Sequence, residues 1–266
     1  MNGILNFAYK NICKMYEFYS TLYENVFLRK CKSQKSFLRK GIFKLKHPFF
    51  ADFEKIHKFD FIKVNKYLRI RSFNNNQKEK LILKVFSKEI REQITSITGF
   101  CFSIDFMIFY DREFIPLKER KVSTLKQAYS YRWHFDKPNS RNMLKIFIPL
   151  NVTKDHGPLE ALSREQSRFL NNFKEIKNMN NITLFLSNKD NIYGLNPTVC
   201  CHKDGIPNQG KIASQVMFQL NPNRKWVINA NLFSRYPSLN SKLGIWTSEP
   251  KFPLISYFRD KRIEFN

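Results

Sequence analysis

The first thirty residues alternate between apolar and polar positions with the period of an α-helix. Apolar residues recur every three or four positions, while lysine and glutamate fill the opposite side. This pattern predicts an amphipathic helix over residues 1–30. Two interpretations stay open for this helix: packing on the main domain, or contact with a membrane surface or a partner. The stretch 29–46 that follows is strongly basic.

A second helical pattern lies just before residue 100. Residues 74–80 read Asn-Asn-Asn-Gln-Lys-Glu-Lys, which predicts a loop. Residues 81–97 then place their isoleucines on one side, which predicts an amphipathic helix ended by Gly99. We therefore expect an N-terminal helical and basic extension over 1–75 and a main domain over 76–266.

Beyond residue 100 the pattern changes to that of β-strands. β-branched and aromatic residues gather in short runs, which are separated by turn-forming residues. These runs predict strands at 100–110, 128–135, 143–151, 182–186, 195–202 and 212–220. Short strands at regular spacing predict an all-β sandwich or barrel core with helices before it.

The composition is that of a folded domain. Of the 266 residues, 42% are hydrophobic and 15% aromatic, which is enough for a packed core and excludes a disordered chain. The sequence contains no run of about eighteen apolar residues, so we expect no membrane span. The first residues lack the pattern of a signal peptide. Five irregularly spaced cysteines favour reduced thiols over disulfides. We therefore expect a cytoplasmic protein.

The formal net charge of +24 raises the question of a polyanionic partner. The excess is mostly lysine, in a chain that is also rich in asparagine, isoleucine and phenylalanine, as expected of an AT-rich genome. This bias spreads the charge over the whole sequence, so the charge alone does not predict binding to nucleic acid. An anionic substrate or loose contact with a negatively charged membrane stays open.

Residues 133–136 read Trp-His-Phe-Asp and suggest a metal site. His134 and Asp136 stand two residues apart, so on a strand both side chains point to one face. A second pair, His202 and Asp204, has the same spacing, but no histidine follows it to complete a set. His134 and Asp136 with His202 as the distant ligand form the one complete set. Two imidazoles and a carboxylate make up the facial triad that binds non-haem Fe(II).

Two other interpretations compete with this iron site. In the first, His134 is a surface histidine and Asp136 a capping aspartate, and neither is related to His202; these two residues would give the same His-x-Asp sequence. The run Cys200-Cys201-His202 raises the question of zinc, but adjacent cysteines on a strand point to opposite faces, and the chain has no second cysteine pair.

Several short segments between about 100 and 220 occur in the order found in one known family, the phytanoyl-CoA dioxygenase-like Fe(II)/2-oxoglutarate oxygenases. The chain resembles this family through a ligand pair, a lysine-containing strand, a polar turn, a Gly-Pro dipeptide and a loop after the distal histidine. The matching segments are Trp133-His134-Phe135-Asp136, Leu144-Lys145-Ile146-Phe147, Leu150-Asn151-Val152, Gly157-Pro158, Thr198 and 202–211.

The resemblance implies a mainly β fold: a double-stranded β-helix (jelly roll, cupin-like) core with flanking helices and an N-terminal helical extension. It also implies Fe(II), 2-oxoglutarate and O₂ as cofactors, with His134, Asp136 and His202 as catalytic iron ligands. The implied activity is that of a dioxygenase that hydroxylates a small organic molecule or a precursor of an envelope component or natural product. Asp136 argues against a halogenase, in which a halide takes the place of the carboxylate.

The family carries a basic residue, usually arginine, shortly after the distal histidine, where it holds the far carboxylate of 2-oxoglutarate. The corresponding positions here are Lys211, Ile212 and Ala213, so Lys211 is the candidate, since an ammonium can also pair with a carboxylate. Arg132 is a rival, because it shares strand parity with the near ligand pair and should face the same cavity. Lys145 and Thr198 are further candidates for cofactor binding.

The chain also departs from the family pattern. The family commonly has Gly-Ser-His soon after Gly-Pro, whereas this chain has 161–165, Ala-Leu-Ser-Arg-Glu, and Tyr131 stands where a glutamine is frequent. Both departures fall on the substrate side, so the resemblance does not identify the substrate. The absent arginine and the charge favour a second hypothesis: a catalytically degenerate member of the fold that binds membranes or polyanions.

Overall fold

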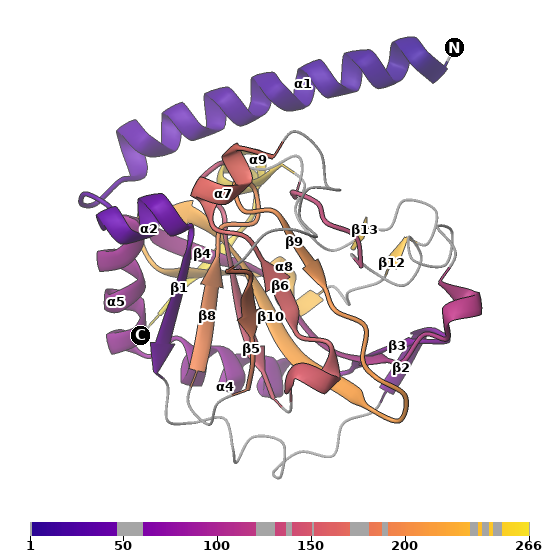
Figure 1. The fold of residues 1–266 in the computed structure, drawn as a ribbon. Helices are drawn as coiled ribbons and strands as arrows, with labels where there is room; N and C mark the ends of the chain where they lie inside the picture. Colours follow the sequence, from indigo (N-terminus) through magenta and orange to yellow (C-terminus); the bar gives the residue numbers. More distant parts are fainter. Residues whose placement is uncertain are drawn as a thin grey trace.

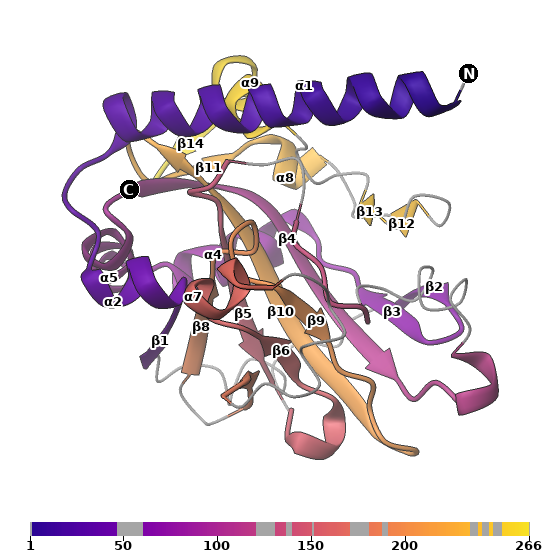
Figure 2. The ribbon, with the colours of Figure 1, turned by 45° about the horizontal axis from the view of Figure 1, so that its top comes forward.

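The computed structural model describes residues 2–46, 61–120, 131–136, 140–150, 152–170, 181–187, 191–234, 239–240, 245–246 and 252–265. Two β-sheets pack against each other, and helices cover the outer face of the larger sheet (Figures 1 and 2). None of the helices in this part of the chain is both long and apolar enough to cross a bilayer.

The N-terminal helix is confirmed. Helix α1 spans Asn2–Tyr23 and continues through a π-helical turn, η1 (Glu24–Leu28). The short helix α2 (Lys35–Lys40) follows it. Figures 1 and 2 show α1 lying across one end of the molecule.

The predicted loop at 74–80 is wrong, because this segment is the start of helix α4 (Asn75–Val85). Asn74 caps the helix: its side chain accepts from the backbone N–H of Gln77, whose own side chain accepts from the backbone N–H of Asn74. The predicted helix over 81–97 is divided in two, because Ser87 caps a second helix, α5 (Lys88–Thr98). Gly99 ends α5 at φ 85°, as expected of a left-handed C-terminal residue.

The larger sheet has nine strands in the order β1-β8-β5-β10-β4-β11-β14, with β3 beside β4 and β2 beside β3. All neighbours are antiparallel except β11 and β4. The strands are β1 (Ile42–Lys46), β2 (Phe61–Asn65), β3 (Leu68–Arg71), β4 (Cys101–Glu113), β5 (Leu144–Pro149), β8 (Asn191–Leu195), β10 (Ile212–Asn223), β11 (Val227–Asn229) and β14 (Arg262–Glu264).

The smaller sheet has the order β7-β6-β9, formed by Thr183–Phe185, Leu159–Ala161 and His202–Asp204. An isolated bridge between His134 and His202 adds the segment 131–136 beside β9. From β4 to β10 the chain therefore passes repeatedly between two four-membered runs, β8-β5-β10-β4 and β7-β6-β9-(131–136). This is the topology of a double-stranded β-helix, and the predicted jelly-roll fold with flanking helices is confirmed.

The strand predictions have mixed outcomes. Those at 100–110, 143–151, 182–186 and 212–220 are confirmed by β4, β5, β7 and β10. Residues 128–130 lie outside the described residues, and 131–136 forms the single bridge rather than a strand. The strand at 195–202 is wrong, because the chain turns between β8 and β9: the Asn196 side chain accepts from the backbone N–H and the hydroxyl of Thr198.

Two segments of the predicted extension over 1–75 join the main sheet, since β1 pairs with β8 and β3 pairs with β4. The domain boundary at residue 75 stays a prediction. The remaining elements are η3 (Leu117–Glu119), η4 (Lys154–His156), α7 (Arg164–Arg168), α8 (Asn231–Ser234), β12 (Leu239–Asn240), β13 (Ile245–Trp246) and α9 (Pro253–Arg259).

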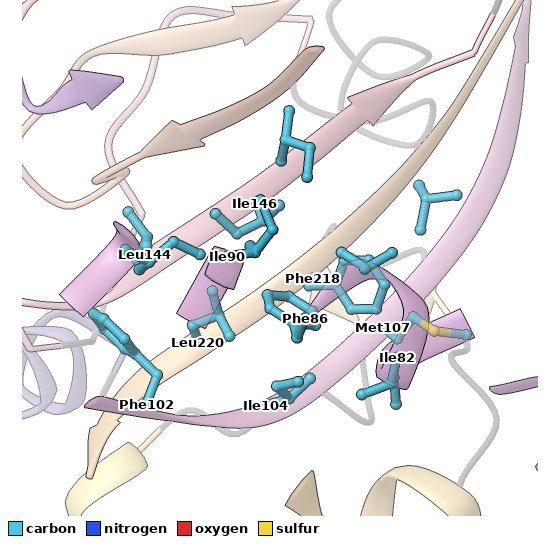
Figure 3. Packing of buried hydrophobic residues seen from close by; sticks show 14 of the residues in the cluster. Ile82, Phe86, Ile90, Phe102, Ile104, Met107, Leu144, Ile146, Phe218 and Leu220 are labelled. Atoms are coloured by element: carbon cyan, nitrogen blue, oxygen red, sulfur yellow. The ribbon is translucent and has the colours of Figure 1, made fainter. Parts of the chain in front are cut away.

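The larger sheet buries side chains on both faces. On its outer face, residues of α4 and α5 pack against alternate residues of the central strands (Figure 3); among them are Ile82, Phe86, Ile90, Phe102, Ile104, Leu144, Ile146, Phe218 and Leu220. The opposite side chains of the larger sheet, among them Phe106, Ile108, Tyr110, Phe147, Tyr193 and Met217, meet Leu159 and Phe185 of the smaller sheet. The space between the sheets is therefore lined mainly by apolar side chains. Any polar site there has apolar surroundings.

Helix α1 is held to the body by a buried acidic residue. The Glu24 side chain is 2% exposed and accepts hydrogen bonds from the Ser140 hydroxyl and from Asn142 Nδ2, the latter at 3.0 Å. Burial raises the pKa of Glu24 to about 7, although both hydrogen bonds act to lower it. The native protein therefore binds this proton more tightly than the unfolded chain does.

This pKa predicts how stability depends on pH. The stabilising contribution of the Glu24 proton is fully present below the ordinary pKa of 4.5 and is lost as the pH rises through about 7. Glu24→Gln keeps the acceptor oxygen without the charge, so above about pH 7 it should raise the free energy of unfolding, by up to roughly 3 kcal/mol. Urea unfolding between about pH 5 and 8 measures this. A variant with the same pH dependence as wild type would contradict the prediction.

Candidate metal centre

Three side chains that lie far apart in the sequence meet at one edge of the smaller sheet. One ligand atom each from His134, Asp136 and His202 lies within 4.8 Å of the others. Asp136 Oδ1 is 3.5 Å from His134 Nε2 and 3.8 Å from His202 Nε2, and the two imidazole centroids are 4.3 Å apart. The structure therefore brings together the three residues that the sequence predicts as iron ligands.

The backbone fixes this arrangement. His134 and His202 exchange two backbone hydrogen bonds, each 3.0 Å long, and Asp136 N donates to Pro197 O at 3.0 Å. The near pair and the distal histidine are thus held on neighbouring extended segments, so their separation depends on the register of the bridge. This explains how ligands so distant in the sequence share one site.

Hydrogen bonds also set which nitrogen of each imidazole is available. His134 Nδ1 lies 2.7 Å from Arg132 O, and His202 Nδ1 lies 3.0 Å from Cys200 O. A carbonyl oxygen accepts only, so each Nδ1 carries the proton and each Nε2 keeps its lone pair. Both lone pairs belong to the atoms nearest Asp136. A backbone carbonyl that orients a ligand imidazole in this way is usual at metal centres.

The surroundings of the site favour the metal-binding forms of His202 and Asp136, whereas Asp136 favours the protonated form of His134. Burial lowers the pKa of His202 to about 3, with a contribution from the neighbouring His134, so this imidazole is neutral at neutral pH. Burial alone would raise the pKa of Asp136, but Lys145 and the two histidines hold it well below its ordinary value. For His134, burial opposes protonation, and Asp136 outweighs it and raises the pKa.

Lys145 contacts the aspartate directly. Its Nζ lies 2.6 Å from Asp136 Oδ2, and its side chain is only 10% exposed. The ammonium engages one carboxylate oxygen, while the other, Oδ1, faces the two imidazoles. The sequence predicts Lys145 as a cofactor-binding residue. The structure places it beside the aspartate, and a contact with a bound cofactor stays a prediction.

The donor set fits Fe(II). Two imidazole nitrogens with free lone pairs and one carboxylate are the ligands of the facial triad, which leaves coordination positions for small molecules. Among the described residues, the group that can hold a metal includes no cysteine. Cys200 packs between the two sheets and Cys201 packs against Leu162, so the zinc interpretation gains no support.

Lys211 and Arg132, the two candidates for holding 2-oxoglutarate, are both exposed. Lys211 lies in the turn before β10, where its backbone N–H donates to Asn208 O. The expectation of a buried Arg132 is wrong, because 131–136 does not form the regular strand on which the parity argument depends. Arg132 serves the site through its carbonyl oxygen, which accepts from His134. The roles of Lys211 and Arg132 in cofactor binding stay predictions.

The sequence analysis missed a buried arginine. Arg112, on β4, is 0% exposed, donates from Nη1 to Gly205 O at 2.7 Å and lies 3.4 Å from Asp204 Oδ1. Asp204 follows His202 by two residues on β9, so both side chains project to the same side. Arg112 also lies directly opposite Ala213 in the β10–β4 pairing. The alternation along β4 contained the signal, since Arg112 shares parity with the inward-facing Tyr110.

Gln219 is a second buried polar side chain near the site. It is 0% exposed, and within the described part of the chain neither of its amide atoms has a hydrogen-bond partner. On β10 it pairs with Lys145 on β5 and with Phe106 on β4, so it points toward the interior between the sheets.

A cleft of about 700 Å³ reaches the centre from outside. Helix α1 and η1 form one wall, and the segment around the ligands forms the other. The lining residues are Lys14, Glu17, Phe18, Thr21, Leu22, Asn25, Phe135, Asp136, Arg141 and Thr198. Thr198, a predicted cofactor-binding residue, therefore shares this cleft with Asp136, a predicted iron ligand.

Comparison with known proteins gives similarity of fold. No family model matches the chain, and no curated protein matches it. EvdMO1 is similar in structure (TM-score 0.44, 16% identity over 70% of this chain), and the chain covers 49% of it, about half its length. The epimerase SnoN, solved with Fe³⁺, alpha ketoglutarate and nogalamycin RO, gives a TM-score of 0.48 at 11% identity, covering 70% of this chain and 80% of SnoN. EctD from S. alaskensis with bound Fe gives a TM-score of 0.48 at 12% identity, covering 70% of this chain and 74% of EctD. Identities this low concern the fold and do not identify the activity.

Proposed function

We propose that this protein is an Fe(II)- and 2-oxoglutarate-dependent oxygenase that hydroxylates a small organic molecule. The observation that carries the proposal is the meeting of His134, Asp136 and His202, with their ligand atoms within 4.8 Å of one another inside a jelly roll. The two imidazoles offer Nε2 because backbone carbonyls hold both Nδ1 protons. This geometry supports the binding of one metal ion by the three residues.

The three ligands would hold Fe(II) through His134 Nε2, His202 Nε2 and Asp136 Oδ1. When bound, the iron with 2-oxoglutarate and O₂ supplies the oxidising chemistry, in which 2-oxoglutarate is converted to succinate and CO₂. Lys145 keeps Asp136 ionised and engages its second oxygen. The apolar side chains between the sheets exclude water around the reacting molecules and strengthen every charge interaction there.

We assign the far carboxylate of 2-oxoglutarate to Arg112. The positions at which the resemblance expects an arginine are 211–213; of these Ala213 is buried on β10, and Arg112 stands directly across from it on β4. A guanidinium has five donors in a planar fork, so Arg112 can keep Gly205 and Asp204 and still bind a carboxylate. An arginine on the neighbouring strand would thus fill the place of the absent one, whereas Lys211 is exposed.

Metal binding gives the first test. Fe(II) or Mn(II) without oxygen, and 2-oxoglutarate in addition, should each raise the melting temperature, because ligands that bind the native state stabilise it. With Fe(II), 2-oxoglutarate and O₂, wild type should release succinate. His134→Ala and His202→Ala should lose both effects. His156→Ala, a histidine outside the centre, should keep them. A melting temperature that neither metal nor 2-oxoglutarate changes would overturn the proposal.

The assignment of Arg112 is tested on Mn(II)-loaded protein by titration with 2-oxoglutarate. Arg112→Lys keeps the charge but loses the bidentate fork, so it should weaken binding by about tenfold or more and leave Mn(II) binding unchanged. Lys211→Ala should bind 2-oxoglutarate like wild type. The exchange Arg112→Ala with Ala213→Arg returns the guanidinium to β10 and should restore part of the affinity. Loss of binding in Lys211→Ala, with none in Arg112→Lys, would show that the assignment is wrong.

A further inference from the structure

The amphipathic helix α1 is packed with its polar side toward the protein. The residues that hold it are Tyr16, whose hydroxyl accepts from Leu254 N at 2.6 Å, Glu17, which accepts from Arg141 Nε at 2.7 Å, and the buried Glu24. Ser20, between them, is 0% exposed. A surface helix ordinarily buries its apolar side, so this orientation leaves the apolar side without a partner in the described protein.

The outward side of α1 and η1 carries a continuous series of large apolar residues. Each of them is more than half exposed, and those on α1 cover an arc of roughly 140° at the 3.6 residues per turn of an α-helix. We call this set the apolar face of α1: Phe7, Ile12, Met15, Phe18, Tyr19, Leu22, Val26 and Phe27. Helix α9 continues it with the exposed Phe258, whose ring lies 5.7 Å from that of Tyr23 (Figures 1 and 2).

Positive charge lies beside the apolar face at Lys14 and in the segment after η1. Residues 1–46 contain ten lysines and arginines and two glutamates, and both glutamates are on the side of α1 that holds it to the body. Lys14 is exposed on α1, and the segment after η1 exposes further cations. They are Arg29, Lys30, Lys32, Lys35, Arg39 and Lys40.

We propose that α1 lies in the surface of an anionic lipid bilayer, and that the cleft beneath it admits an amphipathic substrate from that bilayer. An exposed apolar arc flanked by cations is the pattern of a helix that lies in the interface rather than spanning it. A second copy of the chain fits less well, because a symmetric pair would bring the same cations face to face. An anionic bilayer would bury the apolar side chains and place anionic head groups beside the cations.

The link to the metal centre comes from the cleft. Phe18 and Leu22 belong to the apolar face and also line the cleft that ends at Asp136. Lys14 lines it too, so an acidic head group would meet a cation beside apolar side chains; Arg141, also in the lining, is paired with Glu17. The cleft therefore suits a molecule with an apolar chain and an anionic group. This second part of the inference rests on the proposed oxygenase function, whereas docking on the bilayer does not.

Docking is tested by cosedimentation of the whole protein with vesicles, without added iron or 2-oxoglutarate. Vesicles of phosphatidylcholine with phosphatidylserine should bind wild type, phosphatidylcholine alone should bind it much more weakly, and salt should weaken the binding. The double variant Met15→Glu with Tyr19→Glu changes the apolar face outside the cleft and should weaken binding by at least about tenfold. Leu117→Glu, at a residue 79% exposed on η3, is the matched control and should bind like wild type.

Two results would overturn the docking proposal. One is a double variant that keeps its melting temperature and still binds anionic vesicles like wild type. The other is a wild-type protein that does not bind vesicles and forms a dimer that Met15→Glu abolishes. A second copy of the chain would then cover the apolar face of α1. Neither depends on iron, so docking and the oxygenase function fail separately.

The substrate class is tested with dodecyl phosphate below its micelle concentration. It should raise the melting temperature of the Mn(II)- and 2-oxoglutarate-loaded protein, and Leu22→Glu should abolish the shift while the metal stays bound. Dodecyl maltoside, with the same chain and a neutral head, should bind more weakly. Equal shifts from both compounds would contradict an anionic head group, and no shift from either would contradict the amphipathic substrate.

Discussion

The two backbone hydrogen bonds between His134 and His202 hold the centre together. They join the segment 131–136 to β9, so they complete the smaller sheet and bring three ligands from two distant segments within reach of one ion. The same backbone supplies the carbonyls of Arg132 and Cys200, which set the tautomer of each imidazole. A shift of the register by one residue would turn the ligand side chains to the other face. The centre is therefore a consequence of strand pairing.

The interior around this bridge contains two buried ion pairs, Lys145 with Asp136 and Arg112 with Asp204. Burying two charges costs about as much as their attraction returns, so apolar residues of similar size would stabilise the fold at least as well. These pairs therefore add little net stability to the fold. Each contains a cation that can face an anionic ligand: Lys145 beside Asp136, and Arg112 on β4 beside Asp204, which follows His202 by two residues on β9. Gln219 adds an amide that the described protein leaves without a partner.

The sequence predicted the β-rich core and the three residues that meet at the candidate centre because their signals are local. Runs of β-branched and aromatic residues predict β4, β5 and β10, and the His-x-Asp spacing together with the order of the histidines selects His134, Asp136 and His202. Cofactor-binding residues depend instead on contacts across strands. Arg112 became visible only through its register with Ala213, and the parity argument for Arg132 failed because hydrogen bonding to β9, rather than local pattern, shapes 131–136. The helical period of α1 was correct, but which side faces outward depends on the contacts of Glu17 and Glu24.

The central claim is that this jelly roll holds a metal and a 2-oxoacid at one edge of its smaller sheet. The most direct measurement is anomalous diffraction from crystals grown with Mn(II) and N-oxalylglycine, a 2-oxoglutarate analogue. The account predicts one manganese peak bonded to His134 Nε2, His202 Nε2 and the Asp136 carboxylate, with the far carboxylate of the analogue on Arg112. A centre without manganese, or manganese bound away from these three residues, would contradict it.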